Sequence, residues 1–204
     1  MKLYFRPGAC SMAPHIALRE AGYAFDLVKV DTAKQQTENG EDYAKINPKG
    51  YVPALQLDDG EVLTEVAVIL QYIADRQPDA GLAPRAGTIE RYRVMEWLNF
   101  VSSELHKTLG AFFRFKSVMT PEWKENMLGL FAKRADFLAG QLAGRQYLMG
   151  ERFSIADAYL YTVLGWPDFL QIDTSRWPVF KEYRGRVMSR PAVRETLVAE
   201  GLIK

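Results

Sequence analysis

The sequence has little of several things, and each scarcity excludes a class of protein. It contains a single cysteine, Cys10, so no internal disulfide can form and two-thiol CxxC redox chemistry is excluded. The formal net charge is only +1, which argues against the strongly basic surface of a nucleic-acid-binding protein. Charged residues interrupt every apolar stretch before the roughly 20 residues that a membrane-spanning helix needs. We therefore expect no nucleic-acid and no membrane partner.

The expected compartment is the cytoplasm. Residues 1–7 carry charge but no apolar core segment, so they do not predict a secretory signal peptide. A single cysteine also fits a reducing environment. About half of the chain is hydrophobic, at 48%, which is enough to build a substantial core.

Residues 1–76 alternate between strand and helix patterns and predict an α/β unit. Strands are predicted at 2–5, 25–30, 54–57 and 61–63, and helices at 11–21, 41–46 and 64–75. The Asp59-Gly60 pair predicts a hairpin between the last two strands, because Asp-Gly tolerates positive φ. Strand–helix alternation implies parallel pairing, with the hairpin adding an antiparallel edge.

The pattern changes after Arg76. Residues 77–87 contain two prolines and two glycines and predict a linker. Residues 88–204 contain no credible strand and predict a second, all-helical domain. Its expected helices cover 88–115, 121–142, 154–169, 177–189 and 191–200.

Cys10 is the first residue that suggests chemistry. It lies between a predicted strand and a helix that Ser11 is expected to cap. The unpaired N–H groups and positive dipole end of that helix would stabilise a thiolate and lower the pKa of Cys10. A buried structural cysteine is the alternative. His15, inside the same helix, is expected to be a packed core histidine.

Two further segments suggest a ligand for that thiol. A cis bond at Val52-Pro53, before a strand, would turn the backbone of Val52 outward to pair with an extended peptide, unless the segment is an ordinary loop. Glu65 follows Thr64 at a helix start, where its carboxylate either caps the helix or receives a ligand ammonium group. The amide of Val66 would then receive a carboxylate.

Taken together, these segments resemble the glutathione S-transferases, and the bacterial beta class in particular. The resemblance covers essentially the whole chain and rests on Pro7–Ser11, Asn47–Leu55, Leu63–Glu65, Asn99–Lys107 and Ser154–Asp157. It implies a thioredoxin-like N-terminal domain, an all-α C-terminal domain, a homodimer, and glutathione as substrate without a metal.

The resemblance also implies residue roles. Glutathione would be bound by Cys10, Tyr51, Val52, Pro53, Glu65, Val66, Asn99, Ser103, Glu104, Leu105, His106 and Lys107. Cys10 and His106 would be catalytic, with His106 as proton acceptor or thiolate partner, and Asn99 would reach the partner subunit's ligand. Family members often have serine at Val66 and lysine at Gln35, so two contacts to glutathione differ here.

Helical spacing places Asn99, Ser103 and His106 on one face, which is either a solvated stripe or part of this site. Phe113 and Trp166, near helix ends, are candidates for the wall of an electrophile site, although such aromatics usually belong to the core. The predicted function is conjugation of glutathione to small hydrophobic electrophiles. The alternatives are thiol–disulfide exchange or peroxide reduction through a Cys10 mixed disulfide, and a non-catalytic protein-binding role.

Overall fold

The computed structural model describes residues 1–204 and begins with one five-stranded sheet. The strand order is β3-β2-β1-β4-β5, in which β1 and β2 are parallel and all other neighbours antiparallel. The expected parallel pair and terminal hairpin are confirmed. The strand bounds are β1 Lys2–Phe5, β2 Asp26–Asp31, β3 Gln36–Thr37, β4 Ala54–Gln56 and β5 Val62–Thr64.

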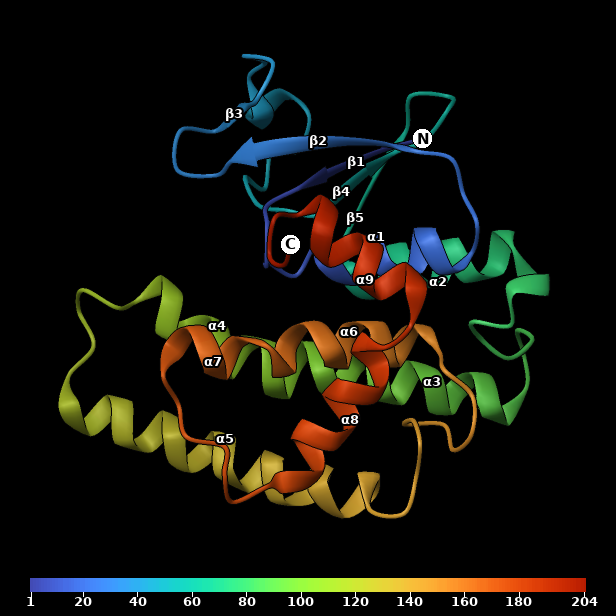
Figure 1. Ribbon diagram of the computed structural model, residues 1–204. Helices are drawn as coiled ribbons and strands as arrows, with labels where there is room; N and C mark the ends of the chain where they lie inside the picture. Colours follow the sequence, from blue (N-terminus) through green and yellow to red (C-terminus); the bar gives the residue numbers. More distant parts are fainter.

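Two helices lie between this sheet and the rest of the chain (Figure 1). They are α1 (Met12–Glu20) and α2 (Val66–Arg76), which pack against each other. The helix α1 ends before Gly22, whose φ of +72° closes the turn into β2. The thioredoxin-like arrangement that the resemblance implies is confirmed for this part of the chain.

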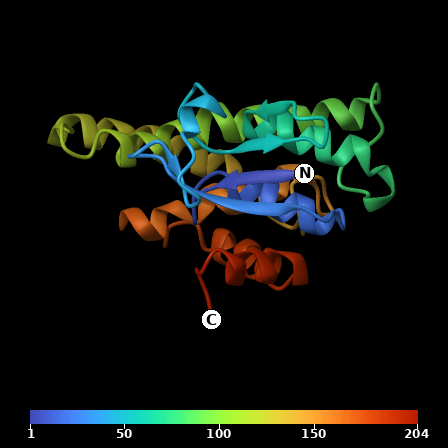
Figure 2. The same ribbon diagram turned by 90° about the horizontal axis from the view of Figure 1, so that it is seen from above.

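The part after residue 88 is helical, as expected. Its helices are α3 Ile89–Phe100, α4 Lys107–Arg114, α5 Pro121–Leu142, α6 Ile155–Leu164, α7 Trp166–Leu170, α8 Pro178–Met188 and α9 Pro191–Ala199. Short 3-10 turns occupy Tyr43–Lys45 and Pro78–Ala80. Seen from above, the strands lie between α3 on one side and the C-terminal α9 on the other (Figure 2).

Two predicted helices are interrupted in the structure, and one segment expected to be a loop contains a strand. The helix predicted at 88–115 is interrupted by a π-helical turn at Val101–His106. The helix predicted at 154–169 breaks at Gly165, where α6 ends and α7 begins with Trp166-Pro167; proline lacks the N–H that would continue the helical hydrogen bonds. The strand β3 lies in the polar segment 31–40, where the sequence pattern indicates only a loop.

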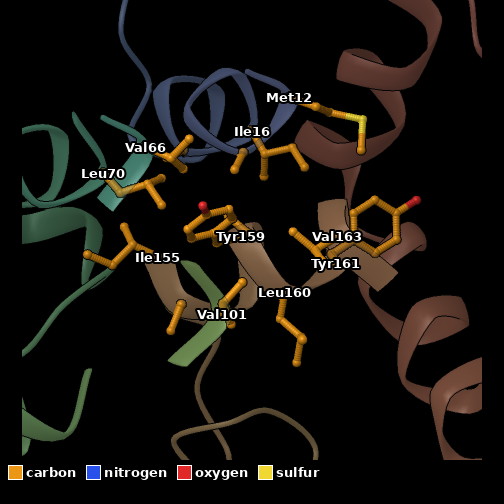
Figure 3. Packing of buried hydrophobic residues seen from close by; sticks show 14 of the residues in the cluster. Met12, Ile16, Val66, Leu70, Val101, Ile155, Tyr159, Leu160, Tyr161 and Val163 are labelled. Atoms are coloured by element: carbon orange, nitrogen blue, oxygen red, sulfur yellow. The ribbon is translucent and has the colours of Figure 1, made fainter. Parts of the chain in front are cut away.

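The helix α6 is the centre of the molecule, and every residue from Ile155 to Leu164 is buried. Its start is fixed by a reciprocal capping box between Ser154 and Asp157. A single cluster of 42 buried side chains joins α6 to both halves of the chain (Figure 3). This shared core holds the sheet half and the helical half in one fixed relation. None of the helices is both long and apolar enough to cross a membrane.

Candidate active site around Cys10

Cys10 lies in the turn that joins β1 to α1. The backbone of this turn passes through Gly8, whose φ is +69°, a conformation that glycine adopts without strain. The Ser11 hydroxyl oxygen accepts from the Arg6 N–H at 3.1 Å and donates to the Arg6 carbonyl at 3.2 Å. Ser11 therefore closes the turn, and the expected side-chain cap on α1 is absent.

The Cys10 thiol is protonated rather than ionised. Its Sγ lies 3.2 Å from the Val52 carbonyl oxygen, to which it donates. Burial raises the pKa of Cys10 to about 12, and this outweighs the lowering by the helix-start amides of Cys10 and Ser11. The prediction of a thiolate with a lowered pKa is therefore wrong for the unliganded protein, because the loss of hydration exceeds the effect of the helix terminus.

The Val52-Pro53 bond is cis, as expected. Side chains brace the backbone just before it: the Tyr43 hydroxyl donates to the Tyr51 carbonyl at 3.0 Å, and the Asn47 amide donates to the same oxygen at 2.7 Å. The Val52 N–H donates to no group of the chain. Val52 thus presents a free donor and an acceptor shared only with Cys10.

Glu65 sits at the start of α2 with a backbone φ of 70°, which is rare for a residue other than glycine. Its side chain makes no cap, so the capping alternative is wrong. Instead Oε1 accepts from Lys49 Nζ at 2.6 Å and from the Tyr51 hydroxyl at 2.8 Å. The bonds from Lys49 first, then Tyr51, lower the pKa of Glu65. The adjoining Val66 amide is one of the first N–H groups of α2, which have no acceptor within the helix.

Gln35 does not extend into this site. Its Nε2 donates to the Thr32 carbonyl at 2.6 Å and to the Gly50 carbonyl at 2.8 Å. These bonds tie the loop after β2 to the segment before Val52. A lysine at this position would add a positive charge, whereas Gln35 joins the two segments through neutral hydrogen bonds.

His106 is the last residue of the π-helical turn and belongs to the helical half of the chain. Its Nδ1 lies 2.6 Å from the Tyr159 hydroxyl of α6, and its ring packs edge-to-face on Trp166 with centroids 4.7 Å apart. Burial, and secondarily the Lys107 charge, lowers the pKa of His106 to about 4. The ring is therefore neutral at physiological pH. Figure 3 shows Tyr159 reaching from α6 toward Val66.

The other predicted residues of this segment have different surroundings. Asn99 and Ser103 are exposed, and the Ser103 hydroxyl donates to the Asn99 carbonyl at 2.9 Å. Glu104 pairs with Arg134 of α5 at 2.6 Å. The Leu105 side chain is fully buried, so it offers no surface to a ligand. The ammonium of exposed Lys107 is close enough to lower the pKa of the Cys10 thiol.

Residues from the helical half hold the turn that carries Cys10. Trp166 Nε1 donates to the Gly8 carbonyl at 3.0 Å, and the Gly8 N–H donates to Glu200 at 2.8 Å. The other oxygen of Glu200 lies 2.9 Å from Nδ1 of His15, and both side chains are fully buried. His15 is thus buried in the core, as expected, but it has this polar partner. Phe113 is half-exposed beside Trp166 at a centroid distance of 5.8 Å.

Three residues of the site escape the sequence patterns. Tyr159 lies in an apolar helix, and Glu200 follows the last helix as an ordinary charged residue. Nothing in their spacing connects them to Cys10. Lys49 lies within the segment Asn47–Leu55 that carries the family resemblance, but no pattern in the sequence predicts its contact with Glu65. No group of three or more His, Cys, Asp or Glu residues is arranged to hold a metal ion.

Comparison with known proteins assigns this geometry to a family. The model for the glutathione S-transferase N-terminal domain matches residues 8–76, and that for the C-terminal domain matches residues 110–191. The chain belongs to the glutathione S-transferase family. The predicted family, fold and enzyme class are confirmed.

Three relatives show how close the similarity is. The chain is 44% identical to glutathione S-transferase GstA of Escherichia coli O157:H7, covering 99% of this chain and 100% of that one. It is 48% identical, with a TM-score of 0.93, to a solved beta class transferase of Sphingomonas chungbukensis, both fully covered. It is also 48% identical, with a TM-score of 0.94 and both chains fully covered, to a sphingomonad enzyme solved with glutathione. The resemblance to the bacterial beta class is thereby confirmed.

Proposed function

We propose that this glutathione transferase conjugates glutathione to small hydrophobic electrophiles, with Cys10 donating its thiol proton to the glutathione sulfur. Residues 1–76 would bind the tripeptide, residues 77–87 would act as a linker, and residues 88–204 would supply the electrophile side. The proposal rests on one observation above all: the Cys10 thiol lies 3.2 Å from the Val52 carbonyl oxygen, to which it donates. The raised pKa of this thiol supports the same role.

The extended tripeptide would pair with the backbone of Val52 at the cis Pro53. The cysteinyl N–H of the tripeptide would donate to the Val52 carbonyl, and the cysteinyl carbonyl would accept from the free Val52 N–H. Once the ligand occupies that carbonyl, the Cys10 proton is free to turn toward the glutathione sulfur. A thiol proton held there stabilises the glutathione thiolate, which is the reactive nucleophile.

The γ-glutamyl end would bind at Glu65 and Val66. The Glu65 carboxylate already accepts from Lys49 and Tyr51 and stays ionised, so it would add the ligand ammonium group as a further donor. The ligand carboxylate would accept from the Val66 amide at the start of α2, where helix geometry favours an anion.

On the helical side, His106 would act as a donor. In this role the Tyr159 hydroxyl would donate to Nδ1, 2.6 Å away, and the ring proton would lie on Nε2, facing the sulfur. This replaces the expected role of proton acceptor, since a ring with a pKa of about 4 is a weak base. Ser103 and Lys107 are exposed beside it and would contact the ligand, while Asn99 would reach the ligand of a partner subunit.

Glu104 and Leu105 would act indirectly. Their side chains are engaged by Arg134 and by the core respectively, so we assign them to positioning of the π-helical turn. The half-exposed Phe113 and the edge of Trp166 would form the apolar wall for the electrophile.

We further propose a cytoplasmic homodimer. Exposed apolar side chains occur on α2, α3 and α5: Val68, Ile89, Tyr92, Met95, Leu130 and Phe137. Trp97 and Phe100 of α3 pack against Phe137 of α5, and these rings line part of a hollow of about 570 Å³. Exposed apolar side chains on these helices suit burial against a second copy of the chain. A free catalytic thiol suits the reducing cytoplasm.

The two alternative functions have less support. Disulfide exchange requires an attacking thiolate, and the Cys10 thiol with a pKa of about 12 holds almost none at neutral pH. A purely protein-binding role would not explain why the Glu65 backbone is strained or why Lys49 and Tyr51 both donate to its carboxylate.

The test is the ionisation of bound glutathione in wild type, Cys10→Ser and Cys10→Ala, followed by the ultraviolet absorbance of the thiolate. A hydroxyl can donate to the thiolate and a methyl group cannot. We expect Cys10→Ser to keep the pKa of bound glutathione near the wild-type value and Cys10→Ala to raise it by about one unit. Equal pKa values in all three would contradict the proposal. Disulfide reductase activity lost in both variants, with conjugation unchanged in both, would assign Cys10 to redox exchange instead.

A further inference from the structure

A second hollow lies between α6, α7 and α8, outside the site described above. It has a volume of about 470 Å³, within the range of pockets for small ligands. Tyr161 lines it from α6, Asp168 from α7, and Lys181 and Arg184 from α8. Figure 3 shows that Tyr161 points to a different side of α6 from Tyr159, the partner of His106.

Tyr161 carries an unused polar group into this hollow. The residue is only 4% exposed, yet its hydroxyl has no hydrogen-bond partner in the chain, unlike those of Tyr159 and Tyr183. Burial raises its pKa, and the nearby Arg184 charge opposes this. The hydroxyl oxygen itself is reached by solvent, so it can donate to a molecule that enters the hollow. Here the free donor faces a space large enough for a ligand.

The charges around the hollow favour an anion. Arg184 donates to Asp168 through Nη1 at 2.6 Å, while its Nε and Nη2 donate to nothing in the chain. Lys181 is exposed and has no ion-pair partner. The hollow is therefore lined by two cations, Arg184 and Lys181, and by one carboxylate, Asp168, which is already paired with Arg184. The remaining charge of +1 matches a ligand with a single negative charge.

The rest of the lining favours a flat apolar body. Leu164 and Phe180 are buried beneath the hollow, and Met188 is exposed at its rim. Gly185 also lines it and places no side chain over the opening, since a Cβ there would meet no atom within 4 Å. A glycine inside a helix costs about 1 kcal/mol relative to alanine.

From these contacts we infer that the hollow between α6, α7 and α8 binds a small aromatic carboxylate. The carboxylate accepts from the Tyr161 hydroxyl, the free Nη2 of Arg184 and the Lys181 ammonium, and the ring packs on Leu164 and Phe180. This site is separate from glutathione binding and does not depend on the proposed function of Cys10.

The test measures binding of 2-naphthoate to the full-length protein by isothermal titration calorimetry, with S-hexylglutathione present to occupy the site at Cys10. The neutral comparator is 2-naphthamide. Tyr161→Phe removes only the hydroxyl, and Lys181→Gln removes one exposed charge. Lys124→Gln, an exposed lysine on α5, is the matched control. Thermal unfolding of each variant shows whether the fold is retained.

We expect saturable 2-naphthoate binding and binding of the amide at least about tenfold weaker. Tyr161→Phe should raise the Kd by about tenfold and Lys181→Gln by about threefold, with Lys124→Gln unchanged. Chemical shifts of the Thr174 and Gly185 amides should move on binding. No binding in the presence of S-hexylglutathione, or an equal Kd for wild type and Tyr161→Phe, would overturn the inference.

Discussion

The two sides of the site around Cys10 are built in opposite ways. The sheet side is shaped by special backbone conformations: the turn at Gly8, the cis bond before Pro53 and the positive φ of Glu65. Its proposed contacts to the ligand are backbone amides and carbonyls. The helical side works through buried side chains, with His106 held by Tyr159 and Trp166. Backbone recognition suits the constant tripeptide, whereas side chains suit a variable electrophile.

The two sides are joined at Gly8. Trp166 donates to its carbonyl and Glu200 accepts from its amide, so residues far along the helical half fix the turn that carries Cys10. The sheet side is therefore not independent: the turn that carries its thiol is positioned by the other half of the chain.

The largest expected effect on stability comes from removing the Glu200 contact that joins the two halves at Gly8. Glu200→Ala leaves His15 and the Gly8 amide without their buried partner, and should destabilise the protein by about 3–5 kcal/mol. The matched control is Glu195→Ala, an exposed carboxylate that pairs with Arg19 at 3.3 Å and should cost under about 1 kcal/mol. Urea unfolding measures both. Equal effects of the two changes would show that the halves are joined elsewhere.

The helical side should make stability depend on acid pH through His106. The folded pKa is about 4, below the usual 6.5, so the unfolded chain binds the extra proton first. Stability is then lost as pH falls from about 6.5 to 4, by up to about 3 kcal/mol. Urea unfolding from pH 7 to pH 4 tests this. In His106→Gln this part of the slope should vanish; an unchanged slope would place the sensitivity on other groups.

The sheet side should depend on Glu65 for glutathione affinity. Glu65→Gln keeps the shape but removes the charge that the ligand ammonium group would meet, and should weaken binding by about 2 kcal/mol, or about 30-fold in Kd. Glu61→Gln, on the turn between β4 and β5, is the exposed control. Calorimetric titration with glutathione measures both. A Glu65→Gln protein that binds normally would remove the γ-glutamyl end from this position.

The smallest expected effect tests how the helical side orients its histidine. Tyr159→Phe leaves Nδ1 of His106 without its partner, and should lower kcat/KM for conjugation by about fivefold. Tyr161→Phe, two residues along the same helix, is the matched control and should leave conjugation unchanged. Nitrogen-15 NMR of the His106 ring would show loss of the single tautomer in Tyr159→Phe only. A tautomer that persists without the hydroxyl would contradict the role of Tyr159.

The sheet side was predictable because its signals are local. A strand, a glycine turn and a helix start place Cys10, and an Asp-Gly pair indicates the hairpin. The Val-Pro pair alone is compatible with an ordinary loop, and the family resemblance is what implies the cis bond. The pKa of Cys10 was not predictable in the same way, because it depends on how far the fold removes water from the thiol. Sequence position reveals the helix terminus but not the desolvation.

The helical side was predictable only in outline. Periodicity finds the long apolar helices, but it treats 88–115 as one regular helix and misses the π-helical turn at Val101–His106, which changes the direction of every later side chain. Tyr159 and Glu200 contact His106 and Gly8 across more than 50 residues of sequence. No local pattern records such partners.

The central claim is that Cys10 is a half-buried, protonated donor rather than a preformed thiolate. The most direct measurement is the rate of Cys10 alkylation by iodoacetamide in the unliganded protein from pH 6 to pH 10, followed by intact mass, which is unambiguous because the chain has one cysteine. With a pKa of about 12, the rate should still be rising at pH 10 and should stay below that of free cysteine. A rate that levels off by pH 7 to 8 would reveal a thiolate and contradict the account.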